Sequence, residues 1–215
     1  MILPLKLKDS AKSLTELGIP VLLVNPESPD QLSDMISLIA TATNTQDKAD
    51  QLLDFINQEK EMLTTSLATA DDTPNIYLAG NSSLLSTAGP AMYQSGIIEL
   101  AGGKNVASDI SDTYWAEISY EQLLSWDPDY IILASDAEYT VDDVLSDPNL
   151  KDCTAVKNNH VYAIPGDIEA LDSPVPASIL ASIWLAGILH PDQVSTDTYT
   201  KEMNSFYETF YGIKK

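Results

Sequence analysis

The side chains that most often carry out catalysis are few in this sequence and form no recognisable motif. The histidines are His160 and His190, and the single cysteine is Cys153. His160 precedes a predicted strand, and His190 ends a predicted helix, where a cation complements the helix dipole. No neighbouring histidine or lysine is placed to activate the thiol. The sequence has no Walker lysine loop, nucleophile elbow or paired zinc-binding histidines. We therefore expect no enzyme activity, no cofactor and no metal site.

Two adjacent aromatic residues, Tyr114 and Trp115, stand in a segment otherwise rich in aspartate and serine. A loop tryptophan exposes apolar area unless it packs or binds something. Two interpretations remain open: the pair packs into the core, or it forms a stacking wall for a flat or apolar ligand.

An exposed acid is predicted shortly after these aromatics. Ser119 and Gln122 have the spacing of a helix capping box, which places Glu121 in the first helical turn. A carboxylate there either complements the helix dipole or offers a contact to a basic partner.

The elements that must position these residues fall into three segments. Residues 1–27 read strand, helix, strand, and residues 28–70 read as two helices, the second of them long. From residue 71 onward, strands (75–79, 105–107, 129–134, 161–164) alternate with helices (90–101, 120–125, 141–145, 176–189, 197–211). This alternation predicts an α/β fold, with a parallel sheet covered by helices on both faces. Ligands of such sheets bind beyond the carboxyl ends of the strands, here residues 80–87, 135–139 and 165–173, with the loop 108–116.

Charge and composition exclude several classes of function. The 215 residues include 11 lysines, no arginine and 32 acidic residues, for a net charge of -21. Such a chain repels nucleic acid and anionic lipid. A single cysteine allows no internal disulfide and no multi-cysteine metal site.

Three segments resemble the class III periplasmic binding proteins, the solute receptors of ABC importers for cobalamin, ferric siderophores, haem and some metals or oxyanions. They are GIIELAGGKNV at residues 96–106, WAEISYEQLLSWDPDYIIL at 115–133 and HVYAIPG at 160–166. LTELGIPV at 14–21 is similar to the end of that family's first lobe, and NTQDKAD at 44–50 to the start of its interlobe helix. The resemblance runs in order along essentially the whole chain.

The resemblance implies two α/β lobes joined by a long helix, with ligand between them. Residues 1–27 would be a remnant of the first lobe, 28–70 a helical segment with the interlobe helix, and 71–215 the C-terminal lobe. The resemblance also implies a complete first lobe, a signal peptide and a lipid-anchor cysteine. This sequence contains only the end of that lobe and neither of the other two features. We therefore expect a truncated form of an extracytoplasmic receptor, either periplasmic or a cell-surface lipoprotein.

The resemblance also implies roles for individual residues. Glu121 would dock on the ABC permease, which works with its ATPase. The family's ligand-binding positions fall on Ser82, Ser86, Thr87, Trp115, Asp167 and Glu169, with Tyr93, Tyr114 and Tyr139 as further candidates. The absence of arginine disfavours a tri-anionic catecholate siderophore. A neutral or cationic metal chelate, or a corrinoid, fits better.

Three functions remain open at this stage. The first is a solute-binding part of an importer for an iron-siderophore, haem or cobalamin-like complex. The second is a metal-ion or oxyanion receptor, of the molybdate type, with the same fold. The third is a chelatase-like enzyme lobe that handles tetrapyrrole. Because the unit at 1–25 cannot cover its own apolar faces, we also expect a homodimer through it or a rearranged amino terminus.

Overall fold

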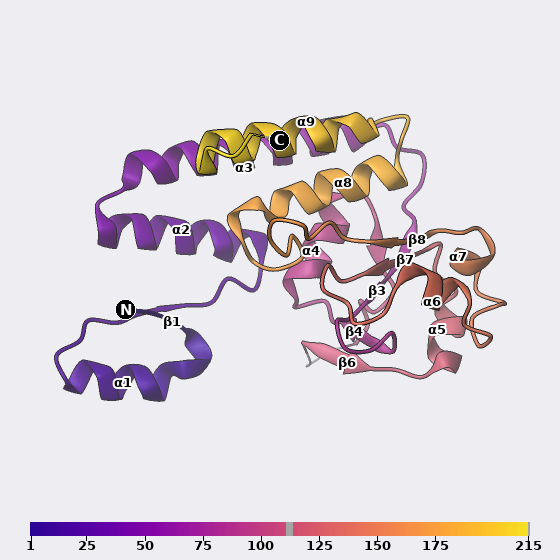
Figure 1. The fold of residues 1–215 in the computed structure, drawn as a ribbon, viewed down its shortest axis with the longest axis horizontal. Coiled ribbons are helices and arrows are strands. Elements are labelled where there is room, and N and C mark those ends of the chain that lie inside the picture. Colours follow the sequence, from indigo (N-terminus) through magenta and orange to yellow (C-terminus); the bar gives the residue numbers. More distant parts are fainter. Residues whose placement is uncertain (111–113, 215) are drawn as a thin grey trace.

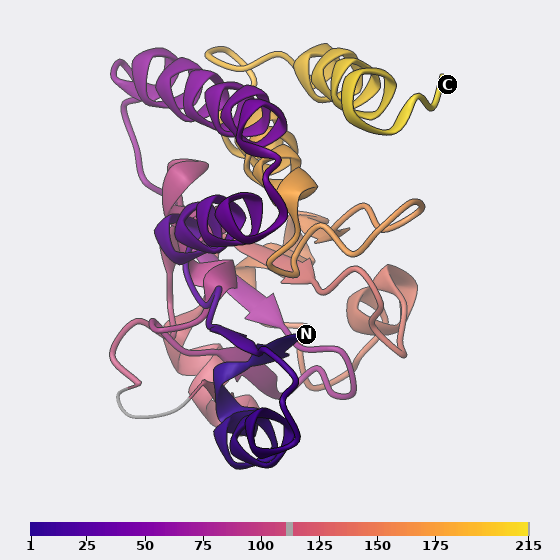
Figure 2. The same ribbon diagram turned by 90° about the vertical axis from the view of Figure 1, so that its left-hand side faces the viewer.

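The computed structural model describes residues 1–110 and 114–214, and their strands form two sheets of unequal size (Figure 1). The smaller sheet pairs β1 (Ile2–Pro4) and β2 (Leu22–Val24) in parallel, joined by a short 3-10 turn (Leu5–Leu7) and α1 (Lys8–Glu16). This unit lies to one side of the main body in Figure 1, and in Figure 2, which is viewed from that side, it lies in front of the main body. The predicted strand–helix–strand order of residues 1–27 is confirmed.

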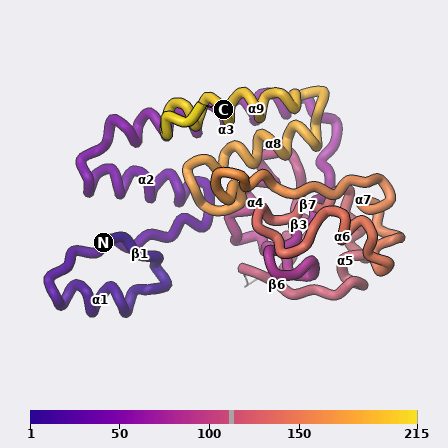
Figure 3. The backbone as a smooth tube through the Cα atoms, in the orientation of Figure 1, coloured from indigo at the N-terminus to yellow at the C-terminus, as the bar shows by residue number. Residues whose placement is uncertain are grey.

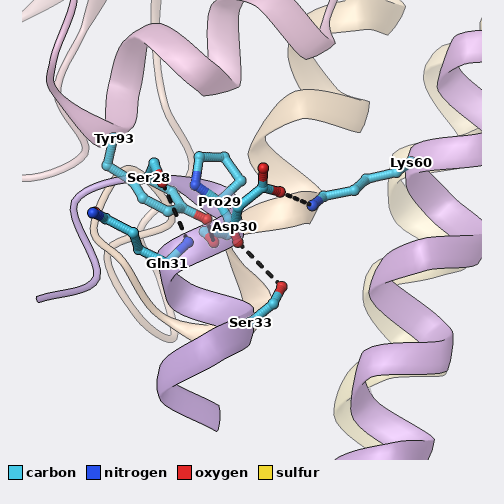
Figure 4. A network of polar contacts seen from close by, with 8 residues as sticks. Ser28, Pro29, Asp30, Gln31, Ser33, Lys60 and Tyr93 are labelled. Carbon is cyan, nitrogen blue, oxygen red and sulfur yellow. Dashed lines mark hydrogen bonds and ion pairs between the residues drawn. The ribbon is translucent and has the colours of Figure 1, made fainter. Parts of the chain in front are cut away.

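Two helices connect this unit to the main body. α2 (Pro29–Thr43) begins where the Gln31 amide donates to Ser28 Oγ at 3.2 Å, and it ends at Asn44, which has a left-handed φ of 55°. α3 (Gln46–Leu67) has 22 residues and is therefore ~33 Å long. Figure 4 shows Lys60 of α3 reaching Asp30 in the first turn of α2, at 3.4 Å.

The larger sheet has the order β6-β4-β3-β7-β8, with β5 paired to the other end of β3. Its parallel strands are β3 (Asn75–Ala79), β5 (Lys104–Asn105), β7 (Tyr130–Leu133) and β8 (Val161–Ala163). At one edge, β4 (Ser86–Ala88) and β6 (Trp115–Glu117) run antiparallel. We predicted loops for these two segments, and that prediction is wrong. Three residues are too few for an alternating pattern, so cross-strand pairing alone makes them strands.

Side chains alternate between the two faces of this sheet. Ile76, Leu78 and Ile132 face one core, which they share with α2, α3, α4 (Tyr93–Leu100), α8 (Ile179–Leu189) and α9 (Thr196–Tyr211). Tyr77 and Ile131 face a second core, which they share with α5 (Tyr120–Trp126), α6 (Val141–Leu145) and α7 (Thr154–Lys157). The α/β fold with helices on both faces is confirmed.

The last two helices complete the first core. α8 follows a short 3-10 turn (Pro176–Ser178), and α9 lies beside α3 along one side of the molecule (Figure 3). The Phe55 ring of α3 lies 5.3 Å from that of Phe206 on α9. Among the described residues, no helix is both long enough and apolar enough to cross a membrane.

Candidate functional site

A hollow of about 490 Å³ opens between the small β1–α1–β2 unit and the main body. Tyr114 and Trp115 form one wall, with exposed fractions of 53% and 39%. The other lining residues come from the first unit (Pro4, Lys6, Val24, Asn25, Pro26 and Glu27) and from two loops of the main body (Met92 and Pro174). The structure therefore brings a face of mixed polar and apolar residues from one unit opposite an aromatic face from the other.

Gly80, at the carboxyl end of β3, supports the Trp115 indole. A Cβ atom at Gly80 would lie 2.9 Å from Trp115 Cζ3, so only glycine leaves room for the ring. The backbone at Gly80 is held on both sides: its amide donates to Ser86 O at 2.7 Å, and Tyr139 Oη donates to its carbonyl at 2.6 Å. Burial raises the pKa of Tyr139, which keeps this donor protonated. Tyr139 thus sits behind the aromatic wall.

Three of the predicted ligand-binding residues are buried within the protein. Thr87 is fully buried and donates to Leu78 O at 2.7 Å, and Ser86 is 7% exposed. Tyr93 is 4% exposed, and its hydroxyl lies 2.6 Å from Ser178 Oγ. None of the three lines the hollow, so they stay outside the site that we propose. Ser82 is exposed, but it does not line the hollow either.

Asp167 and Glu169 face α9 instead of the aromatic wall. Both line a small cavity of about 20 Å³ under α9, which has room for about one water molecule. Tyr207 of α9 donates to Glu169 Oε1 at 2.9 Å. Burial, followed by this bond to a carboxylate, raises the pKa of Tyr207. Tertiary contacts thus direct the Glu169 carboxylate away from the predicted cleft.

The residues that we did not predict are mainly those from the first unit. Lys6 provides a positive charge in the hollow, and Glu27 a negative one. Asn25 directly follows β2, so the rule that ligands bind beyond strand ends pointed to it. We applied that rule only to the larger sheet. Met92 and Pro174 carry no sequence signal, because only the packing of distant loops brings them to the hollow.

Glu121 lies in the first turn of α5, as predicted, and is exposed. Ser119 caps this helix by accepting the Gln122 amide at 3.2 Å. Hydrogen bonds from its own backbone amide and from the Ser119 side chain lower the pKa of Glu121. The carboxylate is therefore ionised at neutral pH and is available to a basic partner.

The two histidines and the cysteine, the residue types most often used in catalysis, pack against other parts of the protein. His160 stacks on Tyr130 at 4.5 Å, and His190 Nε2 lies 3.2 Å from Gly102 O. Cys153 is fully buried, and burial raises the pKa of its thiol. In residues 1–110 and 114–214, no three histidine, cysteine or acidic side chains are arranged to hold a metal ion.

A sequence profile described as "Periplasmic binding protein" matches residues 1–168. The molybdate-binding protein MolA of Haemophilus influenzae is 26% identical to 93% of this chain, which spans 63% of that protein. A vitamin B12-binding protein of Salmonella choleraesuis is 31% identical over 58% of this chain and 46% of its own length. The chain thus spans less than two thirds of these relatives. Both are named as binding proteins.

Solved structures show the same fold along the whole chain. A periplasmic solute-binding protein of Veillonella parvula matches with a TM-score of 0.85 and 26% identity, over 100% of this chain and 66% of that one. The structure of MolA of Haemophilus influenzae bound to molybdate matches with a TM-score of 0.86 and 23% identity, over 100% of this chain and 72% of that one.

Proposed function

We propose, from the premise that this chain belongs to the periplasmic binding protein family, that it is part of an extracytoplasmic receptor of an ABC importer. Its role would be to bind a small solute in the hollow beside Tyr114 and Trp115 and to carry it to a membrane permease. The observation that supports this role best is the pair of exposed aromatic rings on a hollow formed by two separate units.

The shape and chemistry of the hollow favour a flat metal chelate or a corrinoid. A volume of about 490 Å³ lies within the range of small-molecule sites. Tyr114 and Trp115 offer stacking surfaces, and Met92 and the prolines offer apolar contact. Lys6 and Glu27 balance each other in charge, which suits a neutral or zwitterionic ligand. The similarity to vitamin B12-binding proteins agrees with this class.

A tetrahedral oxyanion is the second candidate, and Lys6 is the observation that favours it. This ammonium group is the one cation that lines the hollow among the described residues. The similarity to a molybdate-binding protein extends over 93% of the chain. An oxyanion would use hydrogen bonds from Lys6 and Asn25 and would need no aromatic wall.

Calorimetric titration separates the two classes. Cyanocobalamin, haemin, ferrichrome and sodium molybdate would each be titrated into the wild-type chain, Trp115→Ala, Lys6→Gln and the control Trp126→Phe. A chelate or corrinoid ligand should lose affinity in Trp115→Ala and keep it in the other two. Molybdate should instead lose affinity in Lys6→Gln. Binding that all three substitutions leave unchanged would refute a site at this hollow.

We also propose Glu121 as a contact to the permease. Its carboxylate is exposed and ionised, and it can pair with an arginine on a basic membrane partner. Glu121→Arg should abolish capture by membrane vesicles that contain the cognate importer. Glu61→Arg makes the same charge change on α3 and should leave capture intact. Equal capture of both variants would contradict the proposal.

We also propose that two copies of the chain form a homodimer through the β1–α1–β2 unit. Apolar side chains of this unit are exposed, with Leu17 at 77% and Met1 at 59%, and among the described strands its two strands pair only with each other. A second copy could cover these faces. Light scattering should then give twice the monomer mass, and Leu17→Lys with Ile19→Lys should halve it. A monomeric wild-type chain would exclude the dimer.

A further inference from the structure

We infer that Asn105 is a positioning residue for the aromatic wall, and that its buried amide holds in place β4, the strand on which β6 with Trp115 and the preceding Tyr114 is paired. The inference rests on the proposed function only in treating these aromatics as ligand contacts. Asn105 is 3% exposed and belongs to β5, so its backbone is fixed on the central strand β3.

The Asn105 side chain uses both its donor and its acceptor group. Nδ2 donates to Ala88 O at 2.9 Å and to Ser95 Oγ at 2.8 Å. Oδ1 accepts the Ala107 amide at 2.9 Å. One amide therefore ties together the end of β4, the helix α4 and the turn after β5. In a buried site such a satisfied network specifies a single arrangement.

This network continues to the aromatic wall in two short steps. Ala88 is the partner of Trp115 in the β4–β6 ladder. Ser95 Oγ donates to Gly89 O at 3.0 Å, and the Gly89 amide donates to Tyr114 O at 2.8 Å. The Gly89 amide thus bonds directly to the backbone of Tyr114. Trp115 lies opposite Ala88 in the ladder, so both aromatic residues adjoin residues that the Asn105 network holds. β6 pairs only with β4 among the described strands, so its position depends on β4.

The network also explains why the sheet can end in an antiparallel edge there. β4 pairs with β3 in the ladder at Ala79 and Thr87, and its other bonds to that strand end also come from its first two residues, Ser86 and Thr87. The Asn105 amide supplies a second anchor at the far end of β4. Without it, the strand is held at one end only, and the indole of Trp115 can move away from Gly80.

The experiment reads the position of Trp115 in the absence of ligand. The chain would be labelled with 5-fluorotryptophan, and the three ¹⁹F resonances assigned with Trp115→Phe, Trp126→Phe and Trp184→Phe. Asn105→Ala should shift or broaden the Trp115 resonance. Ser95→Ala, which keeps the Asn105 bonds to Ala88 and Ala107, should do so less. Amide exchange at Gly89 should accelerate by about 25-fold, because the lost buried hydrogen bonds to Ala88 and Ser95 each shift a local equilibrium about fivefold.

The control separates positioning from loss of stability. Leu63→Ala removes a fully buried side chain on α3 and should lower stability without moving the Trp115 resonance. An unchanged Trp115 resonance in Asn105→Ala, or an equal change in Leu63→Ala, would overturn the inference. Because no ligand is added, this result does not depend on whether the proposed ligand classes bind.

Discussion

A carboxyl group buried between two helices should make the stability of this protein depend on pH. Glu59 of α3 is 8% exposed, and it faces Glu202 and Lys201 of α9. Burial, followed by repulsion from Glu202, raises the pKa of Glu59 from 4.5 to about 7, against an opposing effect of Lys201. The Glu202 side chain is itself only 14% exposed, and it bonds to Lys201 at 2.7 Å.

The sign and the magnitude follow from proton linkage. Between pH 4.5 and 7 the folded state binds more protons at Glu59 than the unfolded state, so stability falls as pH rises. Each pKa unit corresponds to about 1.4 kcal/mol, which gives at most about 3 kcal/mol above pH 7. Glu59→Gln cannot ionise and avoids this cost. The free energy of unfolding of this variant should equal that of the wild type near pH 4.5 and exceed it at pH 8.

Thermal and urea unfolding at pH 4.5, 6, 7 and 8 would measure the difference between the two proteins. For a chain of this size, about 3 kcal/mol corresponds to a rise in Tm of roughly 6–12 °C at pH 8. Glu61→Gln is the control, because Glu61 is exposed on the same helix. Parallel stability curves for Glu59→Gln and the wild type across this pH range would refute the reasoning.

Three further predictions test the site and the core. Tyr93→Phe removes the hydrogen bond to Ser178, so it should lower the free energy of unfolding by about 1 kcal/mol and leave ligand affinity unchanged. A loss of affinity without a loss of stability would instead make Tyr93 a ligand contact. Gly80→Ala places a methyl group 2.9 Å from the Trp115 ring, so it should displace the indole and weaken ligand binding in calorimetry. It should also lower the free energy of unfolding by about 1–3 kcal/mol. Unchanged binding would argue against the support role of Gly80. Cys153 should react with a thiol reagent only after denaturant is added, and fast labelling of the native chain would contradict its burial.

The sequence by itself was enough to predict the parallel strands, the family and every α-helix except the four-residue α7. Apolar spacing in α2 and α3 and capping residues such as Ser28 and Ser119 are local signals, and the structure has these helices where they were expected. The alternation of strands and helices after residue 71 likewise predicted β3 and β7 as strands of a parallel sheet. The exposed position of Glu121 followed from the same local chemistry.

The candidate site depended on contacts between residues far apart in the chain. Lys6 and Pro174 line one hollow although they are distant in sequence, and no local pattern records that pairing. Thr87 and Glu169 were predicted ligand-binding residues, yet Thr87 bonds to the Leu78 carbonyl and Glu169 to the Tyr207 hydroxyl. Local sequence determined which segments form helices and strands, because capping and periodicity act over a few residues. Only tertiary packing decided which polar groups bond within the protein and which face the hollow.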